Sequence, residues 1–236
     1  MDIKGKYSIG ILLTFVLLAA AMLYIFPVIG MITGIKEISA ISFFWSRIGI
    51  WCILLITFLY NYSIEKNSFL LKEEKKYSAT FYIKAIVSLY LICSVGGAFL
   101  NLIIQFFTHE KISSKLFQLS LIFKNNYFLI IFTSFTAGAV EEFLMRGYIQ
   151  PRIEKIYNSP VFGILISSLL FGILHSTYGT IGQVVVPFFI GLVFAVFYKK
   201  YSNIKILIIC HFLIDFISLM IMNSIDSKHL SVFLTL

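Results

Sequence analysis

Long apolar runs alternate with short polar segments along most of this chain. A helix needs roughly 20 predominantly apolar residues to cross the hydrocarbon core of a bilayer. The pattern predicts seven such helices, at residues 7–32, 43–62, 85–107, 127–151, 161–178, 182–198 and 204–223. We therefore expect an all-α fold, a polytopic transmembrane helical bundle with about seven spans.

The segments between the runs carry most of the polar residues. The most polar stretch is 65–84, which includes Glu-Glu-Lys-Lys at 73–76, and we expect a loop or a surface helix there. A weakly amphipathic link follows at 109–126. The first apolar run is too long for a signal peptide and no small-residue cleavage site follows it, so we interpret it as an uncleaved first helix. No internal repeat or separate soluble domain is evident.

The composition supports the membrane assignment. The chain has 236 residues, of which 59% are hydrophobic and only 13% are charged, whereas a soluble domain is about a quarter charged. So few charges cannot cover a soluble surface. This excludes an ordinary soluble enzyme, a disordered chain and a nucleic-acid-binding module. Cys52, Cys93 and Cys210 show no pairing pattern, and we expect them to be small packing residues.

The net charge of +8 is interpreted as a topology signal, with a specific anionic partner as the alternative. Lys and Arg collect on the cytoplasmic side of membrane proteins. Twelve of them flank the spans on the side of the N-terminus, against six, including Arg47, on the other side. We therefore predict a multi-pass protein of the cell membrane with a cytoplasmic N-terminus and an external C-terminus. An additional short helix within 112–123 would reverse the C-terminus.

Ionisable residues gather inside three of the late spans. Such a group costs at least about 2.5 to 3.5 kcal/mol at mid-helix, so it is rare there and usually functional. The first three spans show no comparable cluster. The residues are Glu141, Glu142 and Arg146 in the fourth span, His175 in the fifth, and His211 and Asp215 in the seventh. We therefore expect an active site among spans 4, 5 and 7.

The spacing of these residues suggests different tasks for them. Glu142 precedes Arg146 by four residues, the favourable order for an intrahelical ion pair, which would also be consistent with a purely structural role. Glu141 is rotated by about 100° on the same helix, so it is free to face a cavity. His211 and Asp215 are four residues apart and share one face.

One geometric condition must hold for this site. Glu141 and His175 both lie late in consecutive antiparallel spans, which places them toward opposite faces of the membrane. They meet only if the fourth helix extends past Pro151 or the fifth starts later than Val161.

Several sets of residues that are known to cleave bonds within a membrane are absent from this sequence. Only one aspartate, Asp215, lies well inside a span, so an aspartyl pair is absent, as are the zinc motif HExxH and the serine motifs GxSxG and GxSG. Cys210 and His211 are neighbours on a helix and point about 100° apart, which disfavours a dyad. What remains is a carboxylate and an imidazole that activate a water molecule.

Three short motifs resemble those of a known family. They are EExxxR at 141–146, FxxxH at 171–175 and HxxxN/D at 211–215, in this order. Over residues 128–222 the chain resembles the CPBP family, which comprises type II CAAX prenyl endopeptidases and bacteriocin-processing or self-immunity proteins and is also called the Abi family.

The resemblance implies an intramembrane endopeptidase of three parts. These are N-terminal helices with linkers (1–126), a catalytic helical core (127–225) and a short tail (226–236). Carried over by motif position, Glu141 and His175 activate the attacking water, and His211 and Asp215 stabilise the oxyanion. Glu142 and Arg146, also from the first motif, organise the site.

Two questions about this chemistry stay open. The related prenyl proteases usually have Asn in the position of Asp215, so this carboxyl group is either protonated or, as we favour, orients His211. His175, His211 and Glu141 could also supply ligands for a zinc ion, whereas water activation by Glu and His requires no metal.

The expected partners are the lipid bilayer and a peptide or membrane-protein substrate, with no nucleic acid. The composition, rich in Lys, Ile, Asn and Phe, suggests a bacterial source, for which bacteriocin or peptide-pheromone processing, or self-immunity, is a fitting role. The alternative is a non-catalytic membrane immunity or scaffold protein that retains the motifs. The sequence leaves the oligomeric state undetermined.

Overall fold

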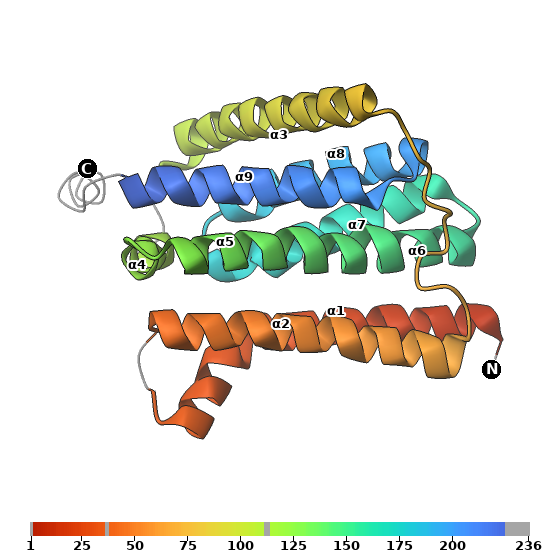
Figure 1. Ribbon diagram of the computed structural model, residues 1–236, viewed down its shortest axis with the longest axis horizontal. Helices are drawn as coiled ribbons and strands as arrows, with labels where there is room; N and C mark the ends of the chain where they lie inside the picture. The colour runs from red at the N-terminus through yellow and green to blue at the C-terminus, as the bar shows by residue number, and fades with distance from the viewer. Residues whose placement is uncertain (1, 36–37, 111–113, 225–236) are drawn as a thin grey trace.

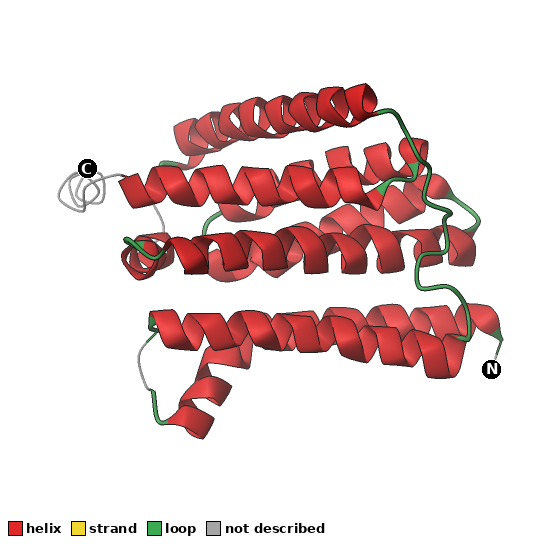
Figure 2. Ribbon diagram, in the orientation of Figure 1, coloured by secondary structure: helices red, strands yellow, loops and turns green. Residues whose placement is uncertain are grey.

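The computed structural model describes residues 2–35, 38–110 and 114–224, and this part of the chain is built from helices and loops without strands (Figures 1 and 2). Seven helical segments in it are long and apolar enough to cross a membrane, which confirms the predicted spans. They are α1 (Ile3–Thr33), α2 with the π-helical turn η1 (Ala40–Glu65), α3 (Ala79–Thr108), α5 to α6 (Tyr127–Tyr157), α7 with η4 (Pro160–Tyr178), α8 (Gly182–Tyr201) and α9 (Ile204–Ser224).

The fourth span is the centre of the bundle. In its most apolar window 67% of the residues are buried, compared with 17% to 33% in the other spans. The α1–α2 hairpin packs on one side of it, and α9 packs along α5 and the turn that follows (Figure 1). On the far side, α3 lies against α8 and α9.

A short helix, α4 (Ser114–Phe123), occupies part of the predicted amphipathic link. With ten residues it cannot cross a bilayer, because a spanning helix needs about 20. The chain therefore enters α1 and leaves α9 at opposite ends of the bundle (Figure 1). Which end faces the cytoplasm stays a prediction from the charge bias. The predicted tail, 226–236, lies outside the described residues.

The prediction that the fourth span ends by Pro151 is wrong. The span continues through two π-helical segments, η2 (Ala137–Glu141) and η3 (Phe143–Ile149), into α6 (Gln150–Tyr157). Pro151 lies in the first turn of α6. A proline is tolerated there because the widened turns before it relieve the steric conflict that a regular α-helix would impose. The fourth helix thus meets the geometric condition: it extends past Pro151, and α7 returns from there toward the level of Glu141.

The longer fourth helix also changes the assignment of Arg152, one of the twelve residues counted on the side of the N-terminus. Arg152 is fully buried and donates from Nε and Nη2 to Oε2 of Glu65, at 2.8 and 2.6 Å. Asn61 accepts a further hydrogen bond from Arg152, and the Tyr148 hydroxyl donates to Glu65. A Cβ at position 10 would collide with the Tyr148 hydroxyl, so a larger residue there would displace this hydroxyl from Glu65. We call Asn61, Glu65, Tyr148 and Arg152 the buried ion cluster.

The predicted polar stretch forms a loop, residues 66–78, that crosses the end of the bundle near the N-terminus (Figure 1). Glu74 caps the start of α9 by accepting from the backbone N–H of Ile204. Burial raises the pKa of Glu74, and this hydrogen bond partly offsets that effect. Lys72 pairs with Glu154 of α6 at 3.0 Å. The loop therefore ties the first two helices to the core.

Candidate active site

A cavity of about 340 Å³ lies among spans 2, 4, 5, 6 and 7 and α4. Four of the six predicted site residues line it: Glu141, His175, His211 and Asp215. The other two, Glu142 and Arg146, are almost fully buried behind its wall. The structure therefore brings together residues that are up to 74 positions apart in the sequence. We call this space the polar cavity.

Glu142 connects two elements of the site. Its Oε1 accepts a hydrogen bond from Nη1 of Arg146 at 2.8 Å, so the predicted ion pair is present. The same oxygen lies 2.7 Å from Nδ1 of His211 on α9. With Glu142 ionised, Nδ1 carries the proton and donates it. The carboxylate thus fixes the imidazole so that its other nitrogen, Nε2, faces the two remaining acids.

The second nitrogen of His211 lies near those acids without a direct hydrogen bond to either. Nε2 is 4.0 Å from Oε2 of Glu141 and 3.7 Å from Oδ2 of Asp215. Spacings of this size suit a bridging water or a substrate atom. The hydrogen bond that holds the ring is donated by His211 to Glu142, whereas the structure shows no direct hydrogen bond to Asp215, which we expected to orient the ring. The spacing of the motifs does not predict this contact between Glu142 and α9.

The close approach of α9 to the fourth span depends on a glycine. A Cβ on Gly138 would lie 2.8 Å from the carbonyl oxygen of Ile208 and 2.9 Å from the amide nitrogen of Phe212. Real Cβ atoms do not come so near to backbone, so a larger residue would push α9 outward. Gly138 therefore sets the distance across which Glu142 reaches His211.

His175 ends α7, where the chain tightens into the single turn η4 (His175–Tyr178). Its Nδ1 lies 2.8 Å from the carbonyl oxygen of Phe171. The Phe171 ring packs on His175, with centroids 4.7 Å apart, and the guanidinium of Arg146 lies 4.6 Å from the Phe171 centroid. Phe171 therefore forms a wall between the cavity and the buried Glu142–Arg146 pair.

Arg47 of α2 was missed as a site residue because it was assigned to the charge bias of a loop. It lies two turns into α2 and lines the polar cavity. It interacts electrostatically with Glu141 and Asp215. The signal was present, since Arg47 falls inside the predicted span 43–62, and the first three spans are therefore not free of ionisable groups. Removing Arg47 and Arg152 from the topology count takes one residue from each side and leaves the bias unchanged.

Comparison with known protein families finds a match that covers this site. Residues 123–217 match the family model described as "Type II CAAX prenyl endopeptidase Rce1-like". The resemblance to the CAAX protease family is confirmed. No curated protein and no solved structure matches the chain. The Rce1-like segment contains all six predicted site residues, whereas Arg47 and the α1–α2 hairpin lie outside it.

The sequence leaves open whether the site holds a zinc ion. Among the residues that the structure describes, no three His, Cys, Asp or Glu side chains lie in an arrangement that could hold a metal ion. The zinc set of Glu141, His175 and His211 therefore does not fit the described geometry, and no step below depends on a metal.

Proposed function

We propose that the chain is an intramembrane endopeptidase that hydrolyses a peptide bond with a water molecule activated by Glu141 and His175. The observation that supports this most is the polar cavity itself. It exposes the Glu141 carboxylate and the His175 ring together, opposite the Nε2 atom of His211. A carboxylate and an imidazole beside one water are the parts of a general-base site.

The reaction uses these groups in sequence. Glu141, oriented with His175 toward the water, accepts a proton as the water oxygen attacks the scissile carbonyl carbon. A tetrahedral oxyanion forms, and Nε2–H of His211 donates to it. Glu141 then returns the proton to the amide nitrogen, the C–N bond breaks, and the products are a carboxylic acid and an amine.

The neighbours of His211 prepare it for this donation. Donating from Nε2 while Nδ1–H remains on Glu142 requires a ring with both nitrogens protonated. The Glu142 carboxylate stabilises that cation, in the way that a buried carboxylate stabilises the imidazolium of a serine protease. Asp215, 3.7 Å from Nε2, adds a second negative charge beside it. Arg146 holds Glu142 in place.

The substrate follows from the setting of the site. A cavity among membrane-spanning helices suits a peptide or a membrane protein delivered from the lipid bilayer. The matched family model is named for prenylated CAAX substrates, whereas the composition suggests a bacterial source, where leader peptides of bacteriocins, peptide pheromones or other membrane proteins are the fitting substrates. We also propose that the protein lies in the cell membrane with its N-terminus in the cytoplasm. Residues 127–225 form its catalytic core.

The buried Glu142–Arg146 pair also supports a second candidate, a non-catalytic immunity or scaffold protein. Arg146 packs against the rings of Phe171 and Phe194, so the pair joins three spans without any chemistry. In that case Glu141→Gln leaves the cellular phenotype intact, whereas Glu142→Ala destabilises the protein.

The test is peptide cleavage by the purified full-length protein in detergent, with a pooled library of apolar peptides read by mass spectrometry. Wild type should cleave, and Glu141→Ala and His175→Ala should not. Glu73→Gln, in the exposed loop, is the matched control and should retain activity. Full activity in both site variants would overturn the assignment.

A further inference from the structure

A second cavity, of about 220 Å³, adjoins the polar cavity on the side of the α1–α2 hairpin. Four residues line both spaces and so form their common wall: Phe43, Arg47, Leu119 and Tyr178. We call the second space the hairpin chamber. Anything that occupies it lies directly beside the atoms proposed to carry out the hydrolysis.

The lining of the hairpin chamber is mostly apolar. α1 contributes Ala21, Met22, Leu23, Ile25 and Phe26, and the remaining apolar residues include Ile38 and Ile50. For comparison, an apolar cavity of roughly 150 Å³ stays dry and binds benzene. A chamber of about 220 Å³ therefore has room for one large aliphatic or aromatic side chain.

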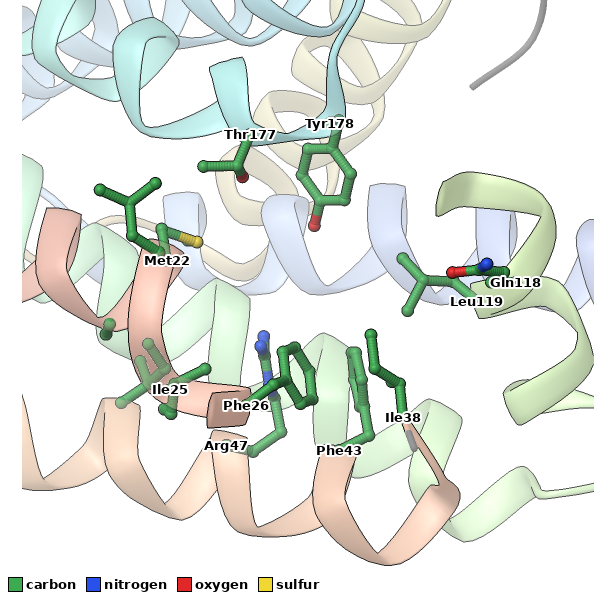
Figure 3. A pocket seen from close by; sticks show the side chains of 13 residues that line it. Met22, Ile25, Phe26, Ile38, Phe43, Arg47, Gln118, Leu119, Thr177 and Tyr178 are labelled. Atoms are coloured by element: carbon green, nitrogen blue, oxygen red, sulfur yellow. The ribbon is translucent and has the colours of Figure 1, made fainter. Parts of the chain in front are cut away.

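Two polar groups mark the passage between the spaces. Figure 3 shows the guanidinium of Arg47 extending into the cavity from α2, and the hydroxyl of Tyr178 pointing toward it from the opposite wall. Arg47 donates from Nε to the Ser46 hydroxyl at 3.3 Å and lies over the Phe43 ring at 4.7 Å. Within the part of the chain that the structure describes, no carboxylate lies within ion-pairing distance of this guanidinium.

An arginine in a spanning helix is costly, and its partner is normally found in a cavity or pathway. A guanidinium presents several donors in a fixed plane, and it has no acceptor of its own. At this passage the acceptor that a bound peptide brings is a backbone carbonyl oxygen. An acyl chain of a lipid brings none, which favours a peptide as the occupant.

We propose that the hairpin chamber is a specificity subsite for a large apolar side chain next to the scissile bond, and that Arg47 positions the substrate by donating to the carbonyl oxygen of that residue. The proposal rests on the proposed endopeptidase activity for the position of the scissile bond. It assigns substrate selection mainly to the N-terminal hairpin, because the Rce1-like segment supplies only Thr177 and Tyr178 to the wall of the chamber.

Filling the chamber tests this directly. Ala21→Phe places a ring in the chamber, whereas Ala20→Phe adds the same ring on the exposed side of α1. For peptides that differ only beside the cleavage position, Ala21→Phe should slow cleavage next to Phe or Leu by roughly 10- to 200-fold and spare cleavage next to Gly. Ala20→Phe should leave the preference of wild type unchanged. Equal slowing of all peptides by Ala21→Phe, or no slowing, would overturn the subsite.

Arg47 is tested by separating binding from chemistry. Arg47→Ala should raise KM about tenfold, the loss of roughly one hydrogen bond to a charged donor, with a smaller change in kcat, and Arg47→Lys should recover part of the loss. A fall in kcat alone, with KM unchanged, would contradict a positioning role.

A measurement without turnover separates this proposal from the proposed function. Apolar peptides that carry a diazirine analogue of leucine are irradiated with Glu141→Gln protein, and the cross-linked residues are mapped. Cross-links to Met22 or Phe26 that disappear in Ala21→Phe support the subsite even if wild type cleaves no peptide. Cross-links confined to other surfaces, or a bound lipid that Ala21→Phe displaces without altering peptide cross-linking, would overturn it.

Discussion

Nδ1 of His211 lies 2.7 Å from Oε1 of Glu142, which joins α9 to the centre of the fourth span. Because the same oxygen also accepts from Arg146, one carboxylate holds both the imidazole and the guanidinium. This arrangement supports our proposal that Glu142 orients His211, a task that the spacing of the motif alone does not reveal.

Glu142→Gln should lower both activity and stability. A neutral glutamine no longer stabilises the imidazolium or fixes its tautomer, and by analogy with the loss of the buried carboxylate in a serine protease kcat should fall by about 10⁴-fold or somewhat less. The buried guanidinium of Arg146 also loses its counterion, which costs about 3 to 5 kcal/mol. Peptide cleavage and thermal unfolding in detergent measure the two effects.

The double variant Glu142→Leu with Arg146→Met separates these two effects. Replacing a whole buried ion pair with apolar side chains is often neutral for stability. Thermal unfolding should therefore return toward that of wild type while activity stays lost. Recovery of activity in the double variant would show that Glu142 is not needed to orient His211.

Glu65→Ala should loosen the α1–α2 hairpin from the core. Glu65 is the counterion of Arg152 in the buried ion cluster, and its removal leaves an uncompensated buried charge, at a cost of about 3 to 5 kcal/mol. Limited proteolysis within the loop 66–78 should accelerate. Glu73 in that same loop is exposed, so Glu73→Ala serves as the control. Equal rates of proteolysis in the two variants would contradict the role of Glu65 in holding the hairpin to the core.

Gly138→Val should reduce activity even though Gly138 does not line the polar cavity. The new side chain meets the backbone of Ile208 and Phe212, and overpacking of this kind costs about 1 to 3 kcal/mol. Outward movement of α9 should also lengthen the contact between Glu142 and His211. The change is measured as cleavage rate alongside unfolding temperature, with Ala20→Val on the exposed side of α1 as the control.

Treatment with a metal chelator should leave peptide cleavage unchanged. Within the described residues no group of three ligands is suitably arranged, and the proposed water activation uses Glu141 and His175 alone. Loss of activity on dialysis against a chelator, restored by added zinc, would contradict this step and return Glu141, His175 and His211 to the role of ligands.

The number and order of the spans could be predicted from the sequence because apolar runs of this length have few alternatives. The end of the fourth span could not, since the usual effect of Pro151 is overridden by the widened turns before it. The position of Glu141 level with His175 depends on the same widened turns. The local sequence pattern does not predict these turns, because the packing of neighbouring helices stabilises them.

The site was predicted in part for a similar reason. Glu142 and Arg146 are neighbours on one helix, so spacing alone predicts their contact, whereas the hydrogen bond from His211 crosses between helices. Arg47 was visible as a charge within a span but was explained by topology. The hairpin chamber has no signature in the sequence, because its walls come from α1, α2, α4 and η4.

The most direct test of the central claim is the initial rate of peptide hydrolysis by Glu141→Gln compared with wild type and Glu73→Gln. Glutamine keeps the size of the side chain but cannot accept the proton of water, so the rate should fall by at least about 10²-fold while the fold and peptide binding persist. A Glu141→Gln protein that hydrolyses peptide as fast as wild type would contradict the account.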